Sequence, residues 1–195
     1  MEVHPIVLNG RIVRLEPLSE SHVPDLTLSA QDESIWQFMV YGRIRTEDQM
    51  RAWILDLLEK QREGTDLPFA VISHRSGKAV GATRYLDICP ENRSLEIGGT
   101  WYSPACQRTG VNTESKYLLL EHAFIELGCV RVQFKTDSRN ERSKRAIERL
   151  GAVCEGILRN HMILPDGYIR DSVIYSITDT EWPSVKDRLE TFLSH

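Results

Sequence analysis

The spacing of hydrophobic residues switches repeatedly between a strand period and a helix period along this chain, and this alternation restricts the fold more than any other feature. Strand-like alternation or short apolar runs occur at residues 11–15, 69–73, 79–88, 94–102, 130–135, 152–162 and 168–177. Helix-compatible segments occur at residues 20–30, 46–63, 112–127 and 140–150, and after Pro183. This order predicts a mixed α/β fold with a mainly antiparallel central sheet and helices on both faces.

Local motifs define several boundaries within this pattern. Thr46 and Gln49 have the spacing of a capping box, in which each side chain bonds a free amide at a helix start. The sequence Pro165-Asp166-Gly167 is typical of a hairpin turn between the last two strands. Residues 35–41 are rich in large apolar side chains and predict either a core strand or the wall of a pocket.

Length and composition predict one globular domain over residues 1–195. Hydrophobic residues make up 41% and charged residues 27%, and no linker or repeat divides the chain. The net charge of −4 argues against a dedicated nucleic-acid-binding protein, which relies on excess cations. We expect no membrane span and no secretory signal, because no apolar run approaches ~20 residues and the first residues lack a signal profile. The histidines are scattered without metal-ligand spacing, which predicts no metal site. The cysteines are also widely spaced, which predicts reduced thiols in a cytoplasmic protein; they are Cys89, Cys106, Cys129 and Cys154.

A loop with the features of a phosphate-binding turn lies between a strand ending near Tyr102 and a helix beginning near Asn112. The first amides of a helix lack intrahelical partners and carry partial positive charge. Gly110 permits a tight turn that directs further amides toward the same point, and Arg108 adds a cation. The alternative is a capped helix start with an exposed arginine, and the spacing alone leaves both open.

The strand before this loop carries a carboxylate and two glycines. Strict alternation predicts one face with Leu95, Ile97 and Trp101, and the other with Glu96, Thr100 and Tyr102. The pair Gly98-Gly99 is typical of a bulge or of close approach by a ligand. Glu96 would then face the ligand, where it can take a proton from an ammonium group directly or through water. The alternative is a solvent-facing glutamate.

Further along, Asn140 opens a helix that ends at Gly151. Together with the loop, this segment resembles the GCN5-related N-acetyltransferases (the GNAT family), and within that family the branch of the ribosomal-protein N-terminal acetyltransferases RimJ and RimL. The resemblance covers nearly the whole chain and is most specific from Trp101 to Gly151. Asn112 stands where the family loop usually has a glycine or alanine. The residues that match the loop are Gln107, Arg108 and Gly110.

The resemblance implies a GNAT-like acyl-CoA N-acyltransferase fold and acetyl-coenzyme A (acetyl-CoA) as co-substrate. The pyrophosphate would bind the backbone amides of residues 108–113, and the pantetheine arm would pair with the strand at residues 100–102. One or two cations of the later helix would meet the ribose phosphate, and the others would form a solvated helix face. The implied coenzyme-binding residues are Thr100, Trp101, Tyr102, Gln107, Arg108, Thr109, Gly110, Val111, Asn112, Thr113, Asn140 and Ser143.

The implied catalytic residues are Glu96 as the base and Ser143 as the acid. Many family members carry a tyrosine in the later helix that protonates the departing thiolate, but Ile147 occupies that position here. Ser143, one turn earlier, matches a serine of the RimL-like branch. Alternatively, Ser143 is a small residue that allows close helix packing, and the thiolate leaves without a dedicated donor.

These features predict an N-acetyltransferase that moves acetyl from acetyl-CoA to a primary amine, and the RimJ/RimL branch suggests the N-terminal α-amine of a protein. The alternatives are a small-molecule amine (a polyamine, an amino acid or an antibiotic) and a non-catalytic CoA-binding regulatory module. Neither a membrane nor a nucleic-acid partner is expected, and a homodimer is expected by family analogy. Residues 20–63 would shape the acceptor site, with aromatic and apolar side chains that alternatively belong to the core: Trp36, Phe38, Met39 and Tyr41.

Overall fold

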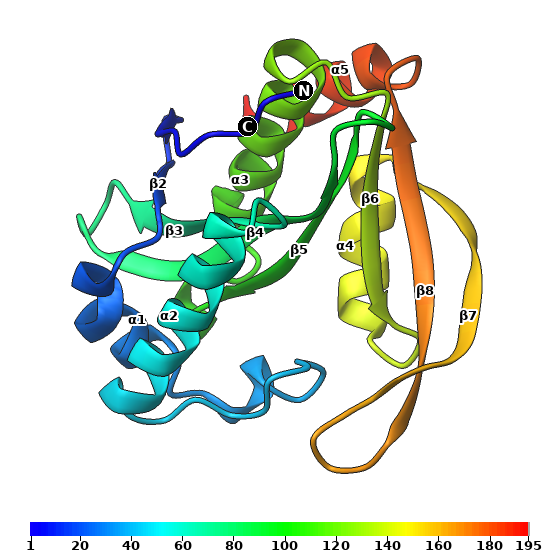
Figure 1. Cartoon of the computed structure of the whole chain (residues 1–195). Coiled ribbons are helices and arrows are strands. Elements are labelled where there is room, and N and C mark those ends of the chain that lie inside the picture. Colours follow the sequence, from blue (N-terminus) through cyan, green and yellow to red (C-terminus); the bar gives the residue numbers. More distant parts are fainter. Residues whose placement is uncertain (195) are drawn as a thin grey trace.

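The computed structural model describes residues 1–194, and its centre is an eight-stranded sheet (Figure 1). Its strands are β1 (Leu8–Asn9), β2 (Val13–Pro17), β3 (Leu67–Ser73), β4 (Ala79–Cys89), β5 (Ser94–Tyr102), β6 (Arg131–Asp137), β7 (Val153–Ile163) and β8 (Ile169–Thr178). Their order across the sheet is β1-β2-β3-β4-β5-β6-β8-β7. All neighbouring strands are antiparallel except β5 and β6, which are parallel. The predicted mixed α/β fold with a mainly antiparallel sheet is confirmed.

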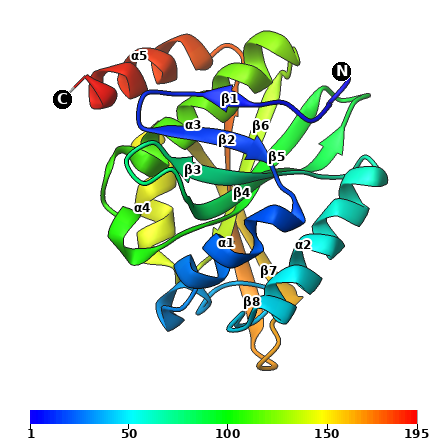
Figure 2. The ribbon, with the colours of Figure 1, turned by 90° about the vertical axis from the view of Figure 1, so that its left-hand side faces the viewer.

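Helices cover both faces of the sheet, as predicted (Figure 2). On one face lie α1 (Val23–Ser29) and α2 (Glu47–Arg62). On the other lie α3 (Gly110–Glu121), α4 (Glu141–Leu150) and α5 (Trp182–Leu193), and a π-helical turn at His122–Glu126 extends α3. Within residues 1–194, none of the helices combines the length and apolarity that a membrane span requires.

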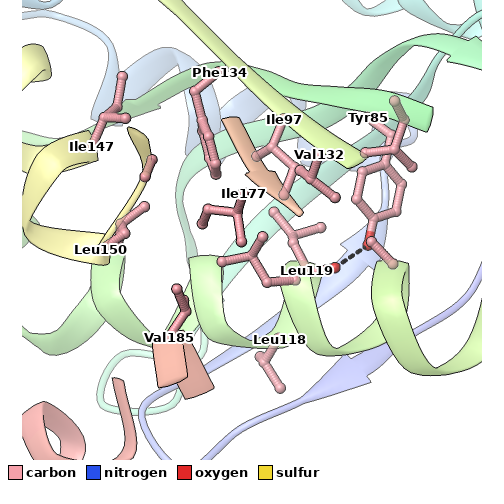
Figure 3. Packing of buried hydrophobic residues seen from close by; sticks show 14 of the residues in the cluster. Tyr85, Ile97, Leu118, Leu119, Val132, Phe134, Ile147, Leu150, Ile177 and Val185 are labelled. Carbon is pink, nitrogen blue, oxygen red and sulfur yellow. Dashed lines mark hydrogen bonds between the residues drawn. The ribbon is translucent and has the colours of Figure 1, made fainter. Parts of the chain in front are cut away.

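Each face of the sheet has its own apolar core. The larger core joins α3, α4 and α5 to the strands through residues such as Leu119, Ile147 and Val185 (Figure 3). Within it, the hydroxyl of the fully buried Tyr85 donates to the carbonyl oxygen of Leu119 at 2.6 Å, so the polar end of the ring is satisfied. Burial of each large apolar side chain contributes about 1.5–3 kcal/mol. This core therefore fixes the positions of α3 and α4, the two helices predicted to contact the coenzyme.

Most local motifs form the predicted elements. The amide of Gln49 donates to the hydroxyl of Thr46 at 3.2 Å, and the Gln49 side-chain oxygen accepts from the Thr46 amide at 3.3 Å, which confirms the capping box of α2. Residues 165–167 form the turn between β7 and β8. Of the two alternatives predicted for residues 35–41, the core strand is wrong. This segment forms turns, because Trp36 packs into the second core and donates its indole N–H to the carbonyl of Ala30 at 2.8 Å.

The parallel strands β5 and β6 are joined only over their first residues. The paired residues are Ser94 with Arg131, Leu95 with Val132 and Glu96 with Gln133. Beyond Glu96, β5 continues to Tyr102 beside β4, while β6 continues beside β8. The two strands therefore separate at Glu96 (Figure 1), and the edge of β5 that follows has no partner in β6.

Candidate active site

A β-bulge determines where the side chains of β5 point. Gly99 and Thr100 together stand opposite a single residue of β4, Thr83. Gly99 has a φ of +57°, a conformation that strains residues with a side chain. The bulge predicted from Gly98-Gly99 is therefore confirmed, and it lies three residues beyond the separation of β5 from β6.

The bulge reverses the alternation of the second half of β5. Leu95, Ile97 and Tyr102 lie in the larger core, whereas Trp101 lies in the second core on the opposite face. The prediction that Trp101 shares a face with Leu95 and Ile97 is wrong, because strict alternation ignores the inserted residue. For the same reason, Glu96 and Tyr102 lie on opposite faces rather than on one, and Glu96 is on the face that α1 and α2 cover farther along the sheet.

Glu96 is buried at the point where β5 leaves β6, with a side chain that is 4% exposed. The side-chain amide of Gln133 donates to its Oε2 at 2.9 Å, and the ammonium of Lys135 lies 3.1 Å from the same oxygen. The alternative of a solvent-facing glutamate is therefore wrong. Because both contacts within residues 1–194 use Oε2, the second carboxylate oxygen is left to accept a hydrogen bond from another donor.

The predicted phosphate-binding loop leads directly into α3, which begins at Gly110 rather than near Asn112. The hydroxyl of Thr109 caps the helix by accepting from the amide of Val111 at 3.3 Å. Arg108 is exposed and has a φ of +59°, and strained backbone of this kind concentrates at functional sites. In the described part of the chain the Arg108 guanidinium has no ion pair. The first-turn amides and this cation together suit an anion.

Gln107 connects the loop to β5 and to α4. Its side-chain N–H donates to the carbonyl oxygen of Tyr102 at 3.2 Å, and its side-chain oxygen accepts from Arg142 at 2.8 Å. Near the end of α4, Arg149 donates to the hydroxyl of Thr113 at 3.1 Å. Gln107 therefore supports the loop, and α4 places two cations beside the first turn of α3.

The start of α4 holds two further predicted residues. The side-chain oxygen of Asn140 accepts from the amide of Ser143 at 3.1 Å, so the predicted cap is confirmed and the Asn140 NH₂ group is left to donate to a ligand. Ser143 is half-buried, and its hydroxyl has no hydrogen bond to any residue from 1 to 194. One turn later, Ile147 is 8% exposed and packs in the larger core. No hydrogen bond joins Ser143 to Glu96 in this range.

Lys116 lies directly beneath the bulge, although no motif predicts a role for it. Its ammonium donates to the hydroxyl of Thr100 at 2.5 Å and to that of Thr83 at 3.3 Å, and the two hydroxyl oxygens are 2.8 Å apart. The side chain is buried, and burial lowers the pKa of Lys116 to about 7. One sequence signal could have predicted that Lys116 is buried. It lies three residues after Thr113 and four before Leu120 on α3, and residues with this spacing share one face of a helix, here the buried one.

On the opposite face of β5, four aromatic rings pack together. The ring centroids of Trp36 and Trp101 are 5.3 Å apart, and those of Tyr41 and Trp53 are 5.8 Å apart. Trp36 is 5% exposed, which confirms the core alternative for this residue. The cluster therefore forms a rigid wall on the face of the sheet that carries Glu96.

A groove of about 490 Å³ crosses β6, β8 and β7. Gln133 and Lys135 line it, and both also contact Glu96, so the groove adjoins that carboxylate. Its opposite wall includes Glu155 and His161. A polar molecule bound here can present an amine toward Glu96.

The fold thus brings the predicted loop, the free edge of β5 and the start of α4 to the place where β5 and β6 separate. An extended ligand with amide groups can add to a free strand edge through main-chain hydrogen bonds, while its phosphates bind a helix N-terminus. This combination fits a phosphorylated, amide-containing coenzyme. Sequence patterns do not predict the three charged residues that surround this region: Lys116, Lys135 and Arg170.

Comparisons with known proteins agree with this geometry. Residues 13–153 match the family model described as an acetyltransferase (GNAT) domain. A crystal structure of a protein from T. thermophilus, named as an acetyltransferase, is 41% identical, with a TM-score of 0.90 and coverage of 99% of this chain and 100% of that chain. YdaF of Bacillus subtilis, named as a ribosomal N-acetyltransferase, is 34% identical over 110 residues, 56% of this chain and 59% of its own.

A more distant structure shares the fold. Mycobacterium smegmatis RimJ in complex with CoA-disulfide is 22% identical, with a TM-score of 0.82 and coverage of 96% of this chain and 94% of that chain. The family model spans most of the sequence, from β2 to the start of β7. The chain therefore belongs to the GNAT family and is an acetyltransferase.

Proposed function

We propose that this acetyltransferase moves the acetyl group of acetyl-CoA to a primary amine, and that its acceptor is the N-terminal α-amine of a protein. The observation that carries the proposal is the separation of β5 from β6 at Glu96, beside the free amides of α3. The similarity to YdaF supports a protein acceptor, and the CoA-disulfide held by RimJ supports CoA as the ligand. Small-molecule amines remain the alternative acceptors.

Acetyl-CoA supplies an activated thioester, and the chain's own residues would bind and orient it. The amides at residues 108–113 and the Arg108 guanidinium would hold the pyrophosphate. The edge of β5 at residues 100–102 would pair with the pantetheine arm, and Asn140 would donate to it from α4. The cations that α4 places beside α3 would approach the ribose phosphate.

In the proposed reaction, the chain mainly aligns the amine with the thioester carbon. The free carboxylate oxygen of Glu96 takes the proton from the acceptor ammonium, directly or through water. A backbone amide near Trp101 stabilises the developing oxyanion. The hydroxyl of Ser143, which has no competing partner in residues 1–194, protonates the leaving thiolate and takes up the proton that the attacking nitrogen loses.

The direct test is a thiol-release assay with acetyl-CoA and a panel of amines, checked by mass spectrometry of the products. The panel contains peptides with free N-termini, polyamines, amino acids and amine antibiotics. We expect acetylation of peptide α-amines with the highest kcat/KM. Acetylation of small amines alone would replace the protein acceptor with a small-molecule one.

Calorimetric titration with CoA separates binding from turnover. Arg108→Ser should weaken CoA binding, because it removes an exposed cation from the loop. Arg62→Ser is the matched control, because it removes a cation at the end of α2. That helix ends near the last residues of β4, whereas the phosphate-binding loop lies near the first residues of β4. CoA binding without acetylation of any amine would favour the regulatory module, and absence of CoA binding would overturn the proposal.

Two further expectations accompany this function. A cytoplasmic location is supported by the four cysteines, which the structure holds as separate free thiols. A homodimer, expected by family analogy, stays a prediction. Sedimentation velocity would measure the oligomeric state.

A further inference from the structure

Arg170 on β8 is a buried cation for which the described chain offers no partner. The residue is 5% exposed, and its Nε is sealed from solvent. No hydrogen bond or ion pair joins the Arg170 side chain to any residue from 1 to 194. An arginine remains charged and carries five N–H donors. Buried polar groups are almost always hydrogen-bonded, and buried charges are almost always paired. A buried guanidinium whose Nε–H is sealed from solvent and has no acceptor in residues 1–194 therefore points to a missing partner.

The neighbouring carboxylates hold other groups, and neither forms an ion pair with Arg170 in the described residues. Asp137 accepts from the backbone N–H of Arg139 at 2.9 Å and from its guanidinium at 3.0 and 2.9 Å. Glu96 is bound by Gln133 and Lys135. Burial lowers the pKa of Arg170, and the more distant attraction of Asp137 and Glu96 offsets this only in part. The missing partner is therefore expected to come from outside the chain.

Arg170 lies on the face of the sheet that carries the proposed base. Lys135 pairs with Ile174 and Asp137 with Ser172, so the alternating row that includes these residues continues to Arg170. Nearby, the Arg139 guanidinium stacks over the ring of Tyr168 at 3.4 Å and faces the ring of Phe38 at 5.5 Å. The segment predicted to shape the acceptor site thus reaches the β7–β8 hairpin beside Arg170.

We propose that Arg170 binds a carboxylate of the acceptor molecule while Glu96 receives the proton of its amine. This inference rests on the proposed function and narrows its acceptor to primary amines that also carry a carboxylate. The planar guanidinium matches a carboxylate through two parallel hydrogen bonds. A dianionic phosphate fits less well, because the nearby charges of Asp137 and Glu96 would repel it more strongly.

The carboxylate has two sources, a free amino acid or an acidic residue near a protein N-terminus, and matched acceptor pairs distinguish them. The peptide pair is Ala-Glu-Ala-Ala-amide and Ala-Gln-Ala-Ala-amide. The small-molecule pair is glutamate α-amide and glutamine α-amide. Within each pair only the side-chain carboxylate changes. We expect the carboxylate member of one pair to have a kcat/KM about 100-fold higher, the scale of a buried charge pair.

Substitution of Arg170 tests whether this residue supplies the preference. Arg170→Met should reduce the preference to about onefold, and Arg170→Lys, which keeps the charge without the planar fork, should retain part of it. Arg159→Met removes a cation from the neighbouring exposed strand β7 and should leave the preference intact. Thermal unfolding without ligand should show Arg170→Met as stable as the natural chain or more so, because an unpaired buried charge is removed.

The outcomes separate this inference from the proposed function. Equal kcat/KM within both pairs, or a preference that survives in Arg170→Met, would overturn the carboxylate site while leaving the acetyltransferase activity in place. A lower Tm for both Arg170 variants would assign the residue a structural role and would also overturn it. If no amine is acetylated at all, calorimetry of the same pairs with the CoA-loaded protein decides, and equal dissociation constants would refute the site.

Discussion

Glu96 combines burial with one free oxygen, which suits a residue that must accept a proton inside the protein. Glu96→Gln preserves the shape and the hydrogen bond from Gln133 but removes the basic carboxylate. We expect kcat to fall about 10²–10⁴-fold, with little change in the KM for acetyl-CoA, because the coenzyme contacts lie elsewhere. Steady-state kinetics measures both. Glu91→Gln, in the exposed turn before β5, is the control, and an unchanged kcat in Glu96→Gln would refute the base assignment.

Lys116 makes the stability of the protein depend on pH in a defined direction. Its pKa is lowered by burial from 10.5 to about 7 in the folded chain. Below pH 7 it is charged in both the folded and the unfolded state, so the full cost of burying the charge is present. Between the two pKa values the folded form has lost the proton and the unfolded form still holds it. Unfolding then takes up a proton, and the free energy of unfolding rises with pH.

Comparison with Lys116→Met isolates this effect. The free energy of unfolding of the natural chain should increase relative to that of the variant from about pH 7 to about pH 9.5. Denaturant titrations of both proteins across this interval measure the difference, in which contributions from other titrating groups cancel. A difference that is flat with pH would contradict the assignment.

At the scale of elements, the strands and helices with a clear period could be predicted from the sequence, and the bulge shows why the rest could not. The pair Gly98-Gly99 signals the bulge, but its effect on Trp101 depends on which residues of β4 lie opposite. The apolar composition of residues 35–41 is compatible with a buried strand and with packed turns. Only the tertiary contacts of Trp36 decide between the two structures.

The bulge itself is open to test through Gly99→Ala. A Cβ at this position would lie 3.0 Å from the Nε of Arg84 and 3.3 Å from the hydroxyl of Tyr41, in addition to the strain of φ +57°. Gly64→Ala is a matched control, because Gly64 has φ +78° and open space around it. We expect Gly64→Ala to cost about 1 kcal/mol with normal activity. Gly99→Ala should cost more and lower kcat/KM, and equal costs with normal activity would contradict a role for the bulge.

At the scale of the whole molecule, the contacts of α4 with α3 and with the loop before it link the two parts of the sheet at the coenzyme site. Gln107 with Arg142 and Thr113 with Arg149 both cross from one part to the other. Sequence patterns predict the loop and α4 separately, since each has a local signal. Sequence patterns do not predict that Arg170 is unpaired. Its pairing depends on Glu96 and Asp137, which are distant in sequence and contact other residues.

These links predict that residues 1–195 unfold as one unit that CoA stabilises. Saturation at 100 times the dissociation constant should raise the free energy of unfolding by about 2.7 kcal/mol. For a chain of this size the increase corresponds to a rise in Tm of about 5–10 °C. Calorimetry and tryptophan fluorescence should report one coincident transition with and without CoA. Two separate transitions would contradict the single domain.

The short joint between β5 and β6 also divides the chain into two contiguous stretches. Strands β1 to β5 all precede residue 103, and β6 to β8 all follow residue 130. Three residue pairs connect the two sets of strands. A recombination point near residue 128 therefore breaks few strand contacts, and chimeras with relatives can exchange the groove and Arg170, together with α4, while retaining the phosphate-binding loop. The groove, Arg170 and α4 can thus be exchanged as one unit in proteins built this way.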